Sequence, residues 1–262
     1  MTVVGGGGAG ATAPVQRSAR SEQLTVYPTR RRVRAVLDGA PLVDSQRGLL
    51  VWEPGGVLPL YAFPREDVDV ARLEPVASPP DAERRPAASA WFGLRAKNQR
   101  GPAAWAYGGV GLDDHLAFAW NAADQWFEEN EEVHGHPRDP FHRVDALFSS
   151  RHVRVEVGGR LIAESDRPVL VFETGLRVRY YLPPGDYDRA LLRSSDTRTV
   201  CPYKGVASYH DVVIGEEVHA DLLWHYPKPL PAMAAIAGML APYAERAELV
   251  IDGERLGRDA EH

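Results

Sequence analysis

The segment Cys201-Pro202-Tyr203-Lys204-Gly205 brings a thiol, a phenol and an ammonium group close together along the chain. A nearby ammonium group favours the thiolate form of a cysteine, which is its nucleophilic form. Lys204 is also suited to bind an anionic ligand directly. The structural alternative makes Cys201 a small buried hydrophobic residue and Lys204 a solvated residue of a turn. We take Cys201 and Lys204 as candidate catalytic residues.

Two glutamates, Glu53 and Glu173, each follow an apolar run and precede a glycine-containing turn. A carboxylate that is partly withdrawn from water has a raised pKa and can act as a general acid or base. The structural alternative is that each glutamate caps the turn or pairs with an arginine such as Arg47 or Arg167. Glu173 is the third candidate catalytic residue, because it shares its half of the chain with the other two.

Aromatic side chains are dense in the same half of the chain. Aromatic residues with polar tips commonly line small-molecule pockets, although they are also common in the cores of β-sheets. The candidate ligand-binding residues are Tyr181, Tyr203, Trp224 and Tyr226.

Four histidines could in principle collect a metal ion: His134, His136, His142 and His152. The glycine and prolines around the first two indicate a loop rather than a strand, and a single cysteine excludes a multi-cysteine zinc site. We therefore expect neither a metal nor a cofactor. The charged residues of this segment favour an ion-pair network that clamps the two halves of the chain together: Arg138, Asp139, Arg143 and Asp145.

The elements that must position these residues occur twice. Val33–Pro64 and Val153–Pro184 align without a gap at an offset of 120, and about a third of the aligned positions are identical, which indicates a tandem repeat. Residues kept by both halves are predicted to be scaffold, and those found in one half are candidates for function. The shared pairs include Ser45 and Ser165, Arg47 and Arg167, Glu53 and Glu173, and Tyr61 and Tyr181.

Each repeat begins with alternating apolar residues, a glycine turn and a continuous apolar run, which together predict antiparallel strands. Further strands are expected near Trp91–Leu94, Ala103–Tyr107, Ala207–Val213 and His219–Trp224. Asp113–Glu129 and Pro231–Glu245 are each predicted to be a helix that packs on the sheet of its own half. Ala71–Ala90 is predicted to be an exposed loop. The expected organisation is a disordered leader at 1–22, a first domain at 23–130, a connector at 131–150, a second domain at 151–257 and a tail at 258–262.

The second half resembles the family known as domain of unknown function 427, in its two-copy form. The resemblance covers nearly all of Arg151–Leu256 and rests on VLVFETGLRVRYYLP, on Cys201-Pro-Tyr-Lys-Gly205 and on Trp224-x-Tyr226-Pro-x-Pro229. It implies a mainly β-fold of the Mss4-like or β-tent kind without zinc. The first half lacks both short motifs, which predicts a degenerate first copy. A nucleotidyltransferase activity, sometimes attached to the family, receives little weight because the chain has no glycine-rich phosphate loop and no paired-aspartate motif.

Composition restricts the class of protein. The 262 residues are 44% hydrophobic and carry a net charge of -6, which gives no electrostatic reason to expect nucleic acid as a partner. The sequence shows no apolar run of the roughly 18–20 residues that span a bilayer. One cysteine excludes an internal disulfide and is typical of a reducing cytosol, so we expect a cytoplasmic protein.

These observations predict a protein that binds an unidentified small molecule in an aromatic-lined pocket of the second domain. Whether it also transforms its ligand is left open. In an enzymatic version Glu173 would move a proton, Lys204 would hold or polarise an anionic group, and the aromatic residues would position an apolar body. The competing hypothesis is a non-catalytic structural or protein-interaction module, in which the aromatic residues only form a core.

Overall fold

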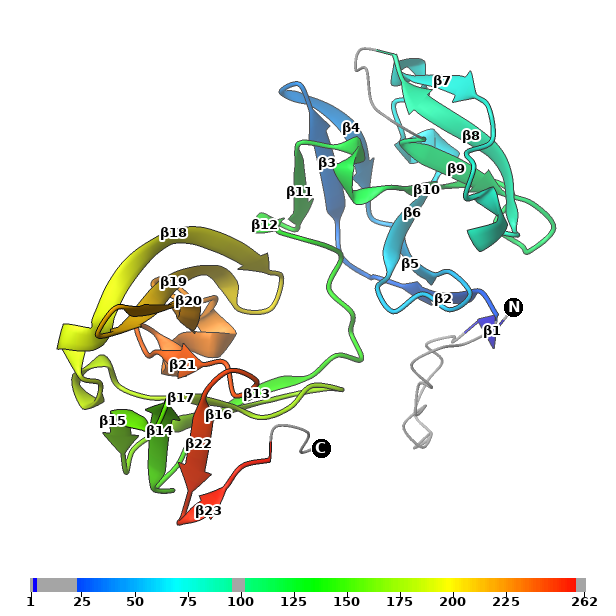
Figure 1. The fold of residues 1–262 in the computed structure, drawn as a ribbon. Helices are drawn as coiled ribbons and strands as arrows, with labels where there is room; N and C mark the ends of the chain where they lie inside the picture. The colour runs from blue at the N-terminus through cyan, green and yellow to red at the C-terminus, as the bar shows by residue number, and fades with distance from the viewer. Residues whose placement is uncertain (1, 4–22, 96–101, 258–262) are drawn as a thin grey trace. The chain divides into compact units, whose positions relative to one another are not determined.

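The computed structural model describes residues 2–3, 23–95 and 102–257. Apart from residues 2–3, the predicted leader and the predicted tail lie outside these residues. The chain divides into two compact units, Met1–Phe141 and His142–His262. Both are built mainly from antiparallel strands, so the expected mainly β class with two domains is confirmed (Figure 1).

The first unit contains one long sheet and one short sheet. The long sheet has the order β1-β2-β5-β6-β10-β9-β8-β7 and the short sheet the order β12-β11-β3-β4. Their bounds are β1 Thr2–Val3, β2 Thr25–Pro28, β3 Val33–Leu37, β4 Ala40–Ser45, β5 Leu49–Trp52, β6 Leu60–Pro64, β7 Leu73–Val76, β8 Ala88–Leu94, β9 Ala104–Tyr107, β10 His115–Phe118, β11 Gln125–Glu128 and β12 Glu131–Val133.

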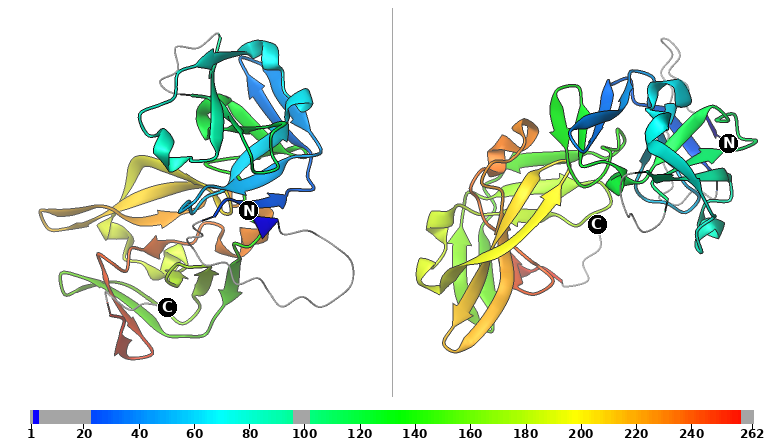
Figure 2. Two further views of the ribbon diagram at one scale, coloured as in Figure 1. Left: turned by 90° about the vertical axis from the view of Figure 1, so that its right-hand side faces the viewer. Right: turned by 90° about the horizontal axis from the view of Figure 1, so that it is seen from above.

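The second unit has three sheets, with orders β13-β16-β17, β18-β19-β20-β21 and β15-β14-β22-β23. A β-bridge between Leu182 and Leu240 joins the first two of these sheets. The long strands β18 to β20 are yellow to orange in Figures 1 and 2. The bounds are β13 Val144–Phe148, β14 Val153–Val157, β15 Arg160–Ser165, β16 Val169–Glu173, β17 Arg179–Tyr181, β18 Leu192–Cys201, β19 Gly205–Ile214, β20 Glu217–His225, β21 Ala241–Pro242, β22 Glu248–Ile251 and β23 Glu254–Arg255.

The two units repeat one topology. The path β2-β5-β6-β10-β9-β8-β7 corresponds strand for strand to β13-β16-β17-β21-β20-β19-β18, and β12-β11-β3-β4 corresponds to β23-β22-β14-β15. Strand β13 falls within the predicted connector, 131–150. It is instead the first strand of the second copy, since it pairs with β16 as β2 pairs with β5.

The gap-free alignment of the repeats breaks at one turn. Leu50 pairs with Tyr61, whereas Leu170, which lies 120 positions after Leu50, pairs with Tyr180. The turn after Glu173 is thus one residue shorter than the turn after Glu53. The structural counterpart of Tyr61 is Tyr180, and the predicted match to Tyr181 is wrong. Tyr181 matches Ala62 instead, so the two units differ in bulk at this position.

Neither predicted packing helix is present. Asp113–Glu129 forms β10, a short 3-10 helix at Trp120–Ala122 and β11. Pairing of β11 with β3 overrides the helical spacing of its apolar residues. Pro231–Glu245 begins with a 3-10 helix at Pro231–Ile236 and then enters β21.

The predicted loop Ala71–Ala90 is partly wrong as well, because it contains β7 and the start of β8. A short hairpin formed by β22 and β23 follows near the end of the described residues. None of the helices among the described residues has the length and apolar character to cross a membrane.

Candidate functional site

A buried ion pair lies at the end of β16. Lys204, in the turn between β18 and β19, donates a hydrogen bond to Oε2 of Glu173. The side chains of both residues are 10% exposed. The other carboxylate oxygen, Oε1, lies 2.9 Å from Nε2 of His142, whose ring stacks on Tyr203 with the ring centroids 4.5 Å apart. Both oxygens of Glu173 are therefore engaged.

The environment of Glu173 keeps it ionised. Burial alone would raise its pKa, but the charge and hydrogen bond of Lys204, with the contribution of His142, outweigh burial and hold the pKa below its ordinary value. Because Glu173 is ionised at neutral pH, it has no proton to donate there. It is better suited to hold the ammonium group of Lys204 in position.

Glu173 and Lys204 line a cavity of about 180 Å³ with aromatic walls. Its other lining residues come mainly from β16, β17, β19 and β20: Val171, Arg179, Tyr181, Tyr209, Trp224, Tyr226 and Tyr243. The structure thus brings together five of the seven residues singled out from the sequence. The two others are not among the lining residues. Cys201 packs against the hydrophobic cluster that contains Tyr181 and Trp224, and Tyr203 stacks on His142.

Hydrogen bonds fix most of the aromatic wall. Trp224 Nε1 donates to the hydroxyl of Tyr181 over 2.9 Å, and the hydroxyl of Tyr209 lies 2.8 Å from Thr199 Oγ1. For the Tyr226 hydroxyl, the described part of the chain supplies no hydrogen-bond partner. Burial raises the pKa of both Tyr181 and Tyr226, so both stay protonated at neutral pH.

The candidate ligand-binding and catalytic residues did not include four residues of the lining: Val171, Arg179, Tyr209 and Tyr243. Arg179 is held by Glu245 through two hydrogen bonds of 2.9 Å, which lower the pKa of Glu245 to about 2. Its guanidinium lies 5.5 Å from the ring centroid of Trp224. Period-two alternation from Tyr181 along β17 would have found Arg179. Tyr243 gives no such signal, because it follows the two-residue strand β21.

The first unit contains a counterpart of this site. Trp105 and Trp224 occupy equivalent positions in the two sheets. Trp105 pairs with Trp91 on β8 and with Ala117 on β10. In the same way, Trp224 pairs with Tyr209 on β19 and with Ala241 on β21. Tyr107 then matches Tyr226. The first copy lacks the full Trp-x-Tyr-Pro motif, but it keeps the Trp-x-Tyr part.

Glu53 occupies the position of Glu173 in this counterpart, but in a different environment. Its Oε1 accepts hydrogen bonds from the Tyr107 hydroxyl at 2.8 Å and from Trp105 Nε1 at 3.2 Å. Its Oε2 is buried without a hydrogen-bond partner among the described residues. The guanidinium of Arg85 lies 4.5 Å from the ring centroid of Trp105. Burial outweighs these partners and raises the pKa of Glu53, so the twin glutamates have opposite pKa shifts.

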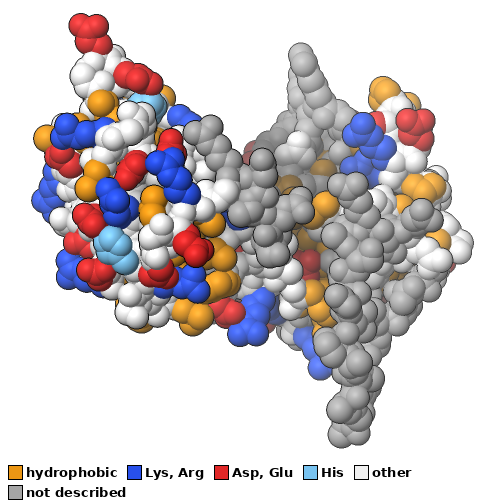
Figure 3. Space-filling model, turned by 60° about the horizontal axis from the view of Figure 1, so that its bottom comes forward, with side chains coloured by type: hydrophobic (Ala, Val, Ile, Leu, Met, Phe, Trp, Pro, Cys, Tyr) orange, Lys and Arg blue, Asp and Glu red, His pale blue; other side chains and the backbone are white. Residues whose placement is uncertain are grey.

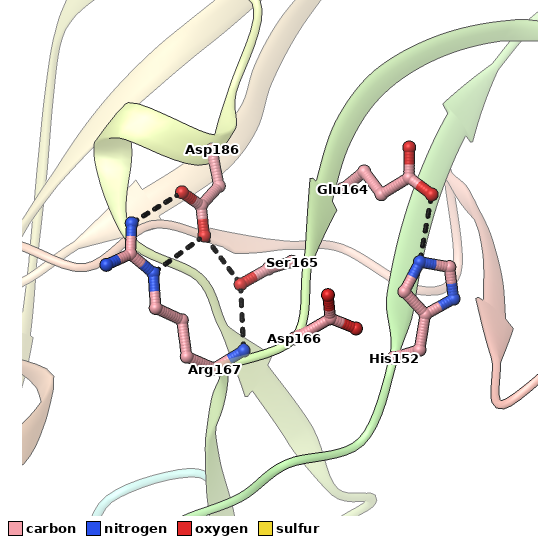
Figure 4. A pocket seen from close by; sticks show the side chains of 6 residues that line it. All are labelled: His152, Glu164, Ser165, Asp166, Arg167 and Asp186. Atoms are coloured by element: carbon pink, nitrogen blue, oxygen red, sulfur yellow. Dashed lines mark hydrogen bonds and ion pairs between the residues drawn. The ribbon is translucent and has the colours of Figure 1, made fainter.

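The serine and arginine kept by both copies form a scaffold cluster. Ser165 donates to Asp186 over 2.6 Å, and Arg167 pairs with the same carboxylate at 2.9 Å (Figure 4). The equivalent residues of the first unit make the same contacts: Ser45, Arg47 and Asp67. The structural alternative that paired these arginines with Glu53 and Glu173 is therefore wrong. The cluster of the second unit borders a polar cavity of about 370 Å³.

Cys201 is a free, half-buried thiol. The hydrogen bonds of the described residues include none from Cys201 to a histidine. His210 of β19 and His225 of β20 stack on each other with ring centroids 5.0 Å apart. In the part of the chain that the structure describes, no three His, Cys, Asp or Glu residues form a group able to hold a metal ion.

Fold and site together define a tandem β-protein whose two copies share a glutamate–tryptophan–tyrosine arrangement. The model of the family described as domain of unknown function (DUF427) matches residues 25–129 and 145–253. The chain therefore belongs to this family and contains two copies of its domain. A search of curated proteins finds no match.

Proposed function

We propose that the second unit binds a small molecule in the cavity between Glu173, Lys204 and the aromatic wall. The observation that supports this proposal is the convergence of a buried ion pair and five aromatic side chains on one cavity of about 180 Å³. Cavities that hold drug-sized ligands measure about 300–1,000 Å³, so the ligand is a smaller molecule.

The Glu173–Lys204 pair supplies the polar end of the site. Removing two charges from water costs free energy that their attraction only partly returns, so a buried pair is weak evidence for stability. Groups whose pKa is shifted by a specific charged partner, as that of Glu173 is, cluster at functional sites. Glu173 positions Lys204, and the ammonium group meets the ligand. Catalytic roles for Glu173, Lys204 and Cys201 stay predictions, as does a cytoplasmic location.

Protein interaction is a second candidate function, and apolar side chains exposed along β13 and β16 support it. Leu147, Phe148 and Phe172 are 54%, 81% and 40% exposed.

The distribution of surface charge gives no support for nucleic acid as a partner. On the face shown in Figure 3, acidic and basic side chains are interspersed, whereas proteins that bind nucleic acid typically carry a patch of positive charge.

The binding function is tested by a thermal-shift screen of metabolites against the full chain and Lys204→Ala. Lys228→Ala is the matched control, because Lys228 is an exposed lysine of the same unit. We expect hits that raise the melting temperature of wild type and Lys228→Ala but not that of Lys204→Ala. Hits that bind all three proteins equally well would remove Lys204 from the site. An absence of hits across metabolite classes would count against the binding function.

A further inference from the structure

The polar groups that face the cavity of the second unit are mainly hydrogen-bond donors. Lys204 has three N–H donors, of which Glu173 takes one. The Tyr181 hydroxyl accepts from Trp224, so its own proton is free to be donated. Among the described residues the Tyr226 hydroxyl has no hydrogen-bond partner. With one partner on each oxygen, Glu173 keeps roughly two of its four acceptor positions. The donors left on Lys204, Tyr181 and Tyr226 outnumber them, so a ligand that brings acceptor oxygens is better matched than one that brings donors.

The charges around the cavity also favour a ligand with acceptor oxygens, and in particular an anion. Two lining residues, Arg179 and Lys204, are cationic, and one, Glu173, is anionic. Glu245 neutralises Arg179 from outside the lining, but its side chain is 43% exposed and therefore more screened by water. The Glu173–Lys204 pair is only 10% exposed, so an anion placed beside Lys204 would interact through a medium of low dielectric constant.

The walls favour a flat apolar body. The ring centroids of Trp224 and Tyr243 lie 4.5 Å apart, and Trp224 contacts Tyr181 edge to face. Flat rings pack well against such surfaces. In both units a flat guanidinium lies near the equivalent indole: that of Arg179 is 5.5 Å from the ring centroid of Trp224, and that of Arg85 is 4.5 Å from the ring centroid of Trp105.

Building on the proposed binding function, we infer that the ligand is a small planar monocarboxylate. Its carboxylate accepts hydrogen bonds from Lys204 and from the hydroxyls of Tyr181 and Tyr226. Its ring packs among the aromatic side chains that line the cavity, which include Trp224 and Tyr243. A charge-assisted hydrogen bond from Lys204 gives the site its preference for a carboxylate over a neutral group of the same shape.

Three probes of nearly the same size and shape separate charge from shape: benzoate is an anion, benzamide is neutral and benzamidine is a cation. Binding to the full wild-type chain is followed by NMR at the Trp224 indole N–H, which a Trp224→Phe spectrum assigns. We expect benzoate to bind about tenfold or more tightly than benzamide, because hydrogen bonds to a charged group are the stronger kind. Benzamidine should bind most weakly. Lys204→Met should remove the preference for benzoate, and Lys228→Met should keep it.

Each outcome decides the inference. If benzamide or benzamidine binds as tightly as benzoate, the carboxylate class is wrong, although the cavity is still a binding site. If none of the three probes shifts the Trp224 resonance, the carboxylate class is also overturned. The metabolite screen then decides separately whether the binding function survives. Should Lys204→Met fail to fold, the comparison of the three probes on wild type is sufficient.

Discussion

The twin glutamates offer the sharpest test of the reasoning, because they hold one position of the fold in opposite environments. In Glu173→Gln, Lys204 remains buried without its counter-ion. Removing one partner of a buried pair costs about 3–5 kcal/mol, a large part of the roughly 5–15 kcal/mol that stabilises a typical domain. Glu53→Gln leaves no lysine stranded, and the new amide oxygen can still accept from Tyr107 and Trp105. We expect Glu53→Gln to lower the free energy of unfolding by less than about 1 kcal/mol.

The pH dependence of the two variants must also differ in sign. The pKa of Glu173 lies below its ordinary value of 4.5, so its stabilising effect is present above that pH and is lost on acidification through the lowered pKa. The pKa of Glu53 lies above 4.5, so wild type loses stability relative to Glu53→Gln as the pH rises from 4.5 through the raised pKa.

Urea denaturation of the full chain at several pH values measures both effects, and hydrogen exchange assigns each loss to its unit. Exchange should quicken at the amides of β16 and β19 in Glu173→Gln, while β5 and β8 serve as the internal control. If Glu173→Gln is as stable as Glu53→Gln at neutral pH, or if both variants follow the same pH trend, the assignment of a buried ion pair to one copy is wrong.

Three further predictions concern the framework of the second unit. Burial lowers the pKa of both His210 and His225, so the folded protein binds their protons less readily than the unfolded chain does. The melting temperature should therefore fall as the pH drops below their ordinary pKa of 6.5. His225→Gln should make this fall smaller. Gly205→Ala should lower the free energy of unfolding, measured by urea denaturation, by about 1–3 kcal/mol. Gly205 has φ +108°, and a Cβ there would lie 3.3 Å from a backbone oxygen. Gly175→Ala is the control and should cost less, because Gly175 has φ +72° and no atom lies close to its Cβ position. Asp186→Ala should destabilise the unit by about 1–3 kcal/mol while leaving ligand affinity in calorimetry unchanged.

The sequence predicted the strands of the second unit well, because their apolar patterns agree with their pairing. It failed at Asp113–Glu129, where apolar residues at helical spacing lie in strands that pair with distant partners. Helical periodicity is a local signal, whereas pairing with β3 and β6 depends on residues far along the chain.

The candidate site was predicted in part, through the residues that short motifs carry. Lys204, Trp224 and Tyr226 stand in such motifs, and the structure places all three on the cavity. Alternation with Tyr181 along β17 points to Arg179, but its pairing with Glu245 cannot be predicted locally because Glu245 lies far along the chain. The turn after Glu173 is one residue shorter than the turn after Glu53. A gap-free alignment at an offset of 120 therefore does not place Trp105 opposite Trp224.

The pairing of an early strand with a late strand in each unit has a consequence for synthesis. Val33 pairs with Glu128 in the first unit, and Val153 pairs with Ile251 in the second. Neither unit can close until its final strands have left the ribosome, and such non-local pairing is intrinsically slow. During that delay the early hairpin of the second copy presents an open edge, while a strand of the same topology, β11, has already been made. Closure of the first copy around its own β11 before the second hairpin emerges would leave that edge without a competing partner.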